Sequence, residues 1–192
     1  MPIGQDAPPP SPEEAERALS RWPTDLAGLR AEWDLMKARW RQTESRAQAL
    51  GEDACRERVG GEWSFVETLR HLVFVTDAWV GRAVLGEAAP YHREALPPTF
   101  LPDLSPLGIE VGADVSLSDA IALRRDAQHV VDRVLDDLDE EGLSRICDPN
   151  PARGFPPETT HPVRRCLQVV LNEESAHLEF ATRDLATLEG AG

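Results

Sequence analysis

Apolar side chains recur at helical spacing along several long segments of the chain. In residues 25–50 they follow alternating steps of three and four, which places them on one face of an amphipathic helix that Gly51 can end. These positions are Leu26, Leu29, Trp33, Met36 and Trp40. Residues 64–86 are apolar almost all round, so we expect this segment to form a central helix that ends at Gly86.

Two further helices show the same pattern. Ser116 or Ser118 can cap a helix that ends at Gly142. The buried face of this helix is predicted to hold Ile121, Ala127, Val130, Val131, Val134 and Leu138. Thr160 precedes the last helix, and two polar positions interrupt its core-facing stripe. The stripe reads Val163, Leu167, Val170, Glu173 or Glu174, His177, Ala181, Leu185 and Leu188.

The first residues carry signals for a loose arm and a short helix. Residues 1–10 end in Ala-Pro-Pro-Pro and have little to bury, so we expect them to form a disordered arm. In Ser11-Pro12-Glu13-Glu14, an N-cap serine, a first-turn proline and a capping-box glutamate predict a short helix that runs to about Arg21. The remainder, residues 11–192, has the length of one domain.

Two segments lack helical periodicity and are rich in proline. Residues 87–115 form a connection of a length that usually crosses over a domain or covers a site. Residues 148–157 form a second loop rich in Pro and Gly. The chain has no alternating strand pattern and no glycine-rich phosphate loop. The sequence therefore predicts an all-α fold, a four-helix bundle with one long crossover loop and a short extra N-terminal helix.

The charge balance limits the classes of partner. The chain has 20 Lys and Arg against 34 Asp and Glu, and its net charge of -14 repels nucleic-acid phosphates and anionic membrane surfaces. The longest apolar stretch, residues 69–84, is interrupted by polar side chains, so we expect no membrane span. The first residues do not resemble a secretory signal, and three cysteines without C-x-x-C spacing fit reduced thiols. We expect a cytoplasmic protein that acts on a small molecule.

Candidate metal ligands lie on two of the predicted helices. Glu173 and His177 are four residues apart, so their side chains can converge on one cation. His71 lies in the middle of the most apolar helix, where antiparallel packing could present it opposite that pair. Two imidazoles and one carboxylate suit zinc, iron or nickel and leave coordination positions open. A lone core histidine or a solvated Glu-x-x-x-His pair needs no metal, but a charged glutamate on a core-facing stripe needs a cationic partner.

Other arrangements of potential ligands are less favoured by their spacing. Glu174 and His177 have the Glu-x-x-His spacing of dinuclear bundles, but that site needs a second such motif, and residues 67–71 have the wrong spacing. His92 and His161 lie in or beside proline-rich segments, where they either line a pocket mouth or are simply solvated. The sequence therefore favours a mononuclear site.

Two motifs resemble those of a known family. Trp63-Ser64-Phe65-Val66-Glu67-Thr68-Leu69-Arg70-His71-Leu72 is similar to the DinB-like signature W-S-x-x-E-x-L-x-H-L. Residues 171–177, Leu-Asn-Glu-Glu-Ser-Ala-His, stand in the place of that family's second metal motif. The resemblance spans about residues 25–188. Many DinB-like proteins use three histidines, whereas the mycothiol-dependent maleylpyruvate isomerase branch uses a His, a Glu and a His, which correspond to His71, Glu173 and His177.

The resemblance implies a DinB-like bundle with a divalent metal, most commonly zinc or nickel. It also implies a thiol-dependent transferase or isomerase that acts on a small electrophile, with a low-molecular-weight thiol as co-substrate. The 87–115 loop would then shape the pocket of the second substrate. An alternative is a non-catalytic bundle that binds a metal or ligand as a stress-related interaction module. A third is a structural homodimer, which predicts no metal and a large apolar surface patch.

Overall fold

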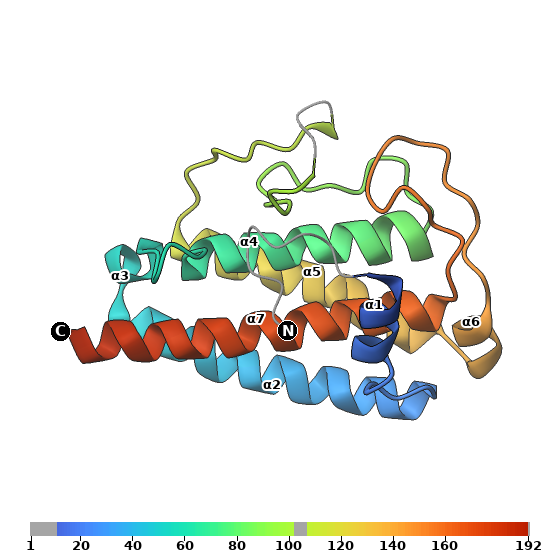
Figure 1. Ribbon diagram of the computed structural model, residues 1–192, viewed down its shortest axis with the longest axis horizontal. Helices are drawn as coiled ribbons and strands as arrows, with labels where there is room; N and C mark the ends of the chain where they lie inside the picture. Colours follow the sequence, from blue (N-terminus) through green and yellow to red (C-terminus); the bar gives the residue numbers. More distant parts are fainter. Residues whose placement is uncertain (1–10, 102–106, 192) are drawn as a thin grey trace.

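The computed structural model describes residues 11–101 and 107–191, and these residues form helices without a β-strand (Figure 1). The elements are α1 (Pro12–Leu19), α2 (Leu26–Leu50), α3 (Glu52–Arg56), α4 (Phe65–Thr76), the π-helix η1 (Asp77–Val84), α5 (Leu117–Asp137), α6 (Glu140–Ser144) and α7 (Val163–Ala191). The predicted all-α bundle with a short extra N-terminal helix is confirmed. The disordered arm was predicted for residues 1–10, which lie outside the described residues.

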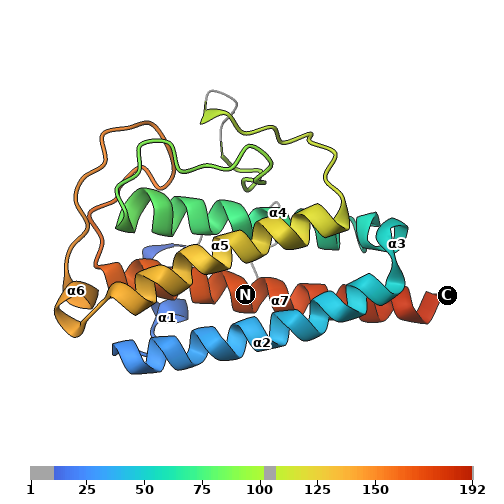
Figure 2. The same cartoon turned by 180° about the vertical axis from the view of Figure 1, so that it is seen from behind.

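Four long elements build the bundle. Helix α2 packs against α5 and α7, and α4 packs against the same two helices (Figures 1 and 2). Their apolar faces meet in one core, where Trp40, Leu69 and Leu72 are completely buried. Burial of such a side chain stabilises the fold by roughly 1.5–3 kcal/mol, so this shared core is the main source of stability. The predicted stripe of α2 is buried, whereas Val130 of α5 and Leu188 at the end of the α7 stripe are only partly buried.

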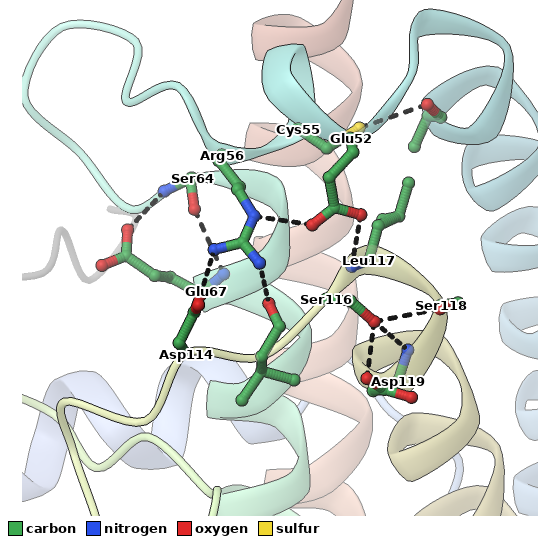
Figure 3. Close-up of polar contacts among 12 residues, drawn as sticks. Glu52, Cys55, Arg56, Ser64, Glu67, Asp114, Ser116, Leu117, Ser118 and Asp119 are labelled. Atoms are coloured by element: carbon green, nitrogen blue, oxygen red, sulfur yellow. Dashed lines mark hydrogen bonds and ion pairs between the residues drawn. The ribbon is translucent and has the colours of Figure 1, made fainter.

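Polar contacts join the helix ends at one side of the bundle (Figure 3). The predicted capping box of α4 is present, because the Ser64 hydroxyl accepts from the Glu67 N–H (3.3 Å) and the Glu67 carboxylate accepts from the Ser64 N–H (2.9 Å). Ser116, rather than Ser118, caps α5. The sequence patterns did not indicate the short α3. This helix positions Arg56, whose Nη1 atom donates to Asp114 Oδ1 (2.6 Å) in the segment just before α5. The beginnings of α4 and α5 are thereby fixed.

Two predicted helix boundaries differ from the structure. The first helix ends at Leu19 rather than near Arg21. The helix expected to end at Gly142 stops at Asp137, because Leu138 is extended and the Asp139 side chain accepts from the Gly142 N–H (2.7 Å). That Asp side chain caps the separate short helix α6, and such local side-chain bonds compete with continuation of a helix.

The central 64–86 segment changes its winding partway along. After Thr76 it continues as the π-helix η1, and the Leu85 N–H donates to the Val80 carbonyl five residues earlier (2.9 Å). The hydrophobic pattern does not distinguish this winding from an α-helix, since both give a buried, mostly apolar segment. π-Helical turns often lie near functional sites.

Two long connections form a loop cover, which we define as residues 85–101, 107–116 and 145–162. The cover lies over α4 on the side away from α2 (Figures 1 and 2). Arg70 of α4 donates to the carbonyls of Glu94 (2.7 Å) and Val111 (2.9 Å). The expected crossover from α4 to α5 is therefore present, and it is fastened to the bundle. Among the described residues, no helix combines the length and apolar character that a membrane span requires.

Candidate metal centre

The structure brings the three predicted ligands together between α4 and α7. His71 projects from α4, and Glu173 and His177 project from successive turns of α7. The Glu173 Oε2 atom lies 3.5 Å from His177 Nε2 and 3.8 Å from His71 Nε2, and the two imidazole centroids are 4.7 Å apart. One donor atom from each residue lies within 4.8 Å of the others. This spacing allows all three side chains to reach one cation.

A backbone carbonyl from the loop cover orients His71. The Nδ1 atom of this buried ring lies 3.0 Å from the Leu96 carbonyl oxygen. Because a carbonyl only accepts, Nδ1 carries the proton, and the lone pair of Nε2 is directed toward Glu173. Metal-ligating histidines typically hold their second nitrogen in this way.

The ionisation of the site suits a divalent cation. Burial lowers the pKa of His71 and outweighs the nearby Glu173 carboxylate, so the imidazole is neutral. Burial alone would raise the pKa of Glu173, but the adjacent imidazoles, that of His177 more than that of His71, outweigh burial and lower this pKa to about 2. An ionised carboxylate beside imidazole nitrogens is the ligand chemistry that zinc, iron and nickel accept. The residues present therefore fit a divalent metal.

Aromatic side chains enclose the two histidines. The Trp63 ring lies 4.5 Å from the His71 ring and 6.0 Å from the His177 ring, between centroids. Phe74 lies 6.4 Å from His71, and Phe180 lies 5.9 Å from His177. The contact of Trp63 with both imidazoles was not predicted from the sequence. The signal for it was its position directly before the Ser64 cap in the family signature.

Glu174 does not take part in the cluster. Its side chain is fully buried and pairs with Arg124 of α5. In the described part of the chain, His71, Glu173 and His177 form the one group of three His, Cys, Asp or Glu donors close enough for a cation. The geometry thus agrees with the preference for a mononuclear arrangement.

The other candidate residues lie away from this cluster. His92 is exposed, and His161 is half-buried against Trp79, with ring centroids 5.7 Å apart. Cys55, Cys147 and Cys166 are buried free thiols. Trp63 also lines a small pocket, together with Phe65, Thr68, Ala181, Leu185, Leu188 and the acidic Glu57 and Asp184.

Comparisons with known proteins agree with the motifs. A family model of the DinB superfamily matches residues 35–181, which is well over half of the chain and includes all three candidate ligands. The comparison with curated proteins found no match, and neither did the comparison with solved structures. On the strength of the family match, this chain belongs to the DinB superfamily.

Proposed function

We propose that this protein is a metal-dependent enzyme in which His71, Glu173 and His177 hold one divalent cation, zinc or nickel. The observation that carries the proposal is the approach of their donor atoms to within 4.8 Å of one another. An accidental cluster of this kind would leave a largely buried carboxylate without a permanent cationic partner, which is costly. The hydrogen bond from His71 Nδ1 to Leu96 supports the same assignment.

The proposed reaction joins a low-molecular-weight thiol to a small electrophile. A bound divalent cation lowers the pKa of a thiol that coordinates it, and so makes thiolate available near neutral pH. The thiolate sulfur forms a bond to an electrophilic carbon, and the leaving group departs with the bonding electron pair. For an isomerisation, the adduct instead eliminates the same thiol, and the proton released to water at the start is returned. Neither course needs an oxidant or a reductant.

The protein residues have defined parts in this proposal. The Leu96 carbonyl keeps the proton on His71 Nδ1, while Trp63 and Phe74 exclude water from the imidazoles. The Glu173 side chain is 16% exposed, against 6% for His71 and 7% for His177. Solvent and substrate are therefore proposed to approach beside Glu173. We place the reaction in the cytoplasm, since all three cysteines are free.

Elemental analysis of protein purified without a polyhistidine tag tests the metal assignment. The wild type is expected to hold about one zinc or nickel per chain, and His71→Ala or His177→Ala to lose it. His129→Ala is the matched control, because His129 is an exposed histidine of α5. Equal metal content in wild type and His71→Ala would rule out the site.

A thiol conjugation screen with small electrophiles then tests the chemistry. The metal-loaded wild type should give turnover that His71→Ala lacks. A second candidate function, a non-catalytic metal-binding bundle, is favoured by the closure of the site, because the side chains of His71 and His177 are only 6% and 7% exposed. Metal binding without turnover for any small thiol would support this second function.

A further inference from the structure

Two consecutive glutamates of α7 have entirely different partners. Glu173 faces His71 of α4, whereas Glu174 faces Arg124 of α5. Glu173 is four residues before His177 and Glu174 is three before it, and both spacings place side chains on one face of a helix. Sequence spacing alone therefore permits either glutamate to join His177 at a metal. The structure must contain something that selects one of them.

The environment of Glu174 is a charged cluster inside the bundle. Arg124 and Glu174 are both completely buried, and the guanidinium also lies 5.6 Å from the ring centroid of Trp40. A second carboxylate, Glu44 of α2, is 2% exposed, and burial raises its pKa against the lowering effect of the Arg124 and Arg125 charges. It also contacts Arg125 at 3.5 Å. The cluster therefore ties α7 to α5, with α2 close by.

Stability does not explain this cluster well. The Arg124 Nε and Glu174 Oε1 atoms are buried without a hydrogen-bond partner among the described residues. A buried ion pair with incomplete hydrogen bonding commonly contributes less than apolar side chains of similar size. The best-attested role of such pairs is to fix the register of packed helices. That role fits the position of Glu174 beside a candidate ligand.

We propose that the Arg124–Glu174 pair is a positioning device that sets the rotation of α7, so that Glu173 and not Glu174 is presented to His71. The inference rests on the proposed metal function. A buried carboxylate needs a cation, and the cations beside these two glutamates are the Arg124 guanidinium and the proposed metal. Because Arg124 forms an ion pair with Glu174, Glu173 remains available to bind the metal. If Arg124 is lost, Glu174 is left without a cation and competes for the metal. If Glu174 is lost, Arg124 is left without a carboxylate and pairs with Glu173. A rotation of α7 would relieve either unpaired charge.

Cobalt(II) titration of the full chain tests this role, because the absorption spectrum of bound cobalt reports its ligands as well as the affinity. In Arg124→Met, Glu174 is free to compete for the metal. We expect cobalt affinity to fall by about 10–100-fold, the range typical when groups that orient metal ligands are removed, and the spectrum to change. Circular dichroism at the assay temperature verifies that each variant is folded.

A double variant separates positioning from general damage. Arg124→Met with Glu174→Met removes both buried charges, leaves Glu44 with Arg125, and should restore affinity to within about threefold of wild type. Arg46→Met is the matched control, because Arg46 and Glu189 form an exposed α2–α7 ion pair (2.9 Å) far along α7 from the ligands. This control should leave both affinity and spectrum unchanged.

Each remaining outcome has a defined meaning. If Arg124→Met does not fold, the cobalt titration of Glu174→Leu tests the positioning role instead. This variant leaves Arg124 near Glu44 and free to pair with Glu173. We expect it to bind cobalt about tenfold more weakly than the wild type. Wild-type affinity and spectrum in the folded single variant would overturn the positioning role alone. Failure of the wild type to bind cobalt would overturn both this role and the proposed function.

Discussion

The helical bundle and the loop cover are held in different ways. Leu69 and Leu72 of α4 lie in a shared apolar core, where their contribution depends on the area removed from water. The cover is fastened to α4 and to η1 by hydrogen bonds from the buried Arg70 and Arg82 to backbone carbonyls. Apolar burial is non-directional, whereas hydrogen bonds fix particular atoms. The bundle therefore supplies most of the stability, and the hydrogen bonds of the cover fix the positions of particular backbone atoms.

The polar anchors of the cover come mainly from one helical segment. Arg82 of η1 is buried, and it donates to the carbonyls of Pro156 (3.1 Å) and Asn150 (3.2 Å). The Tyr91 hydroxyl donates to the Phe155 carbonyl (2.9 Å), which joins the two halves of the cover. The glycine at position 81 lets the cover approach η1 closely, because a Cβ atom there would lie only 2.7 Å from the Pro90 Cβ atom.

The two regions meet at the candidate metal centre. His71 is held on its helix by the bundle, and the ring orientation is set by the Leu96 carbonyl of the cover. Leu96 is positioned in turn because its N–H donates to the Arg70 carbonyl (3.1 Å). Damage to the bundle should therefore unfold the whole protein, and damage to the cover should act locally.

The largest effect is expected from a cavity in the bundle. Leu69→Ala removes a completely buried side chain, and we expect it to lower the free energy of unfolding by about 2–5 kcal/mol. Urea denaturation followed by circular dichroism measures this loss. Leu35→Ala is the control, because Leu35 is 45% exposed and its replacement should change stability by less than about 0.5 kcal/mol. Equal losses in the two variants would contradict the description of the core.

A smaller and local effect is expected from the cover. Arg82→Met removes the donors to three loop carbonyls, those of Asn150, Ala152 and Pro156, and should lower the free energy of unfolding by about 1–3 kcal/mol. Hydrogen exchange should accelerate in residues 145–162 and remain slow in α2. Uniform acceleration along the whole chain would show that the cover is not separable from the bundle.

The sequence predicted the bundle because its helices carry strong local signals. The stripe of α2 and the capping box of α4 depend on residues close together in the chain, so spacing alone reveals them. His71, Glu173 and His177 were also foreseeable as a set, since each lies on a core-facing position and the motifs resemble those of one family. What the pattern left open was the choice between Glu173 and Glu174.

The cover and the buried charges could not be predicted in the same way. Arg70, Arg82 and Arg124 are spaced as ordinary helix residues, and their carbonyl or carboxylate partners are distant in sequence. Backbone carbonyls carry no sequence signature, so the contact of Leu96 with His71 was invisible before the fold was known. The π-helix was missed because its pattern resembles that of a buried α-helix.

The smallest effect is expected from Asp77, a residue that holds the cover and makes the stability of the protein depend on pH. Asp77 begins η1, and its carboxylate accepts from the His92 N–H (2.8 Å). Burial raises the pKa of Asp77 from 3.8 to about 7, against the lowering effect of this hydrogen bond and with a further increase from the Glu87 charge. The folded state therefore binds a proton that the unfolded state has already released between about pH 4 and pH 7.

This difference has a defined sign. Because the folded state holds more protons in that window, Asp77 makes the free energy of unfolding fall as pH rises from about 4 to 7. Asp77→Asn keeps an oxygen that can accept from His92 but cannot ionise, so the decline should be shallower in this variant and stability at pH 7 should be equal to or above that of wild type. Urea denaturation at several pH values measures both slopes. Parallel curves for the two proteins would mean that Asp77 is already ionised in the folded state, and that the cover tolerates a buried charge where the structure indicates a neutral acid.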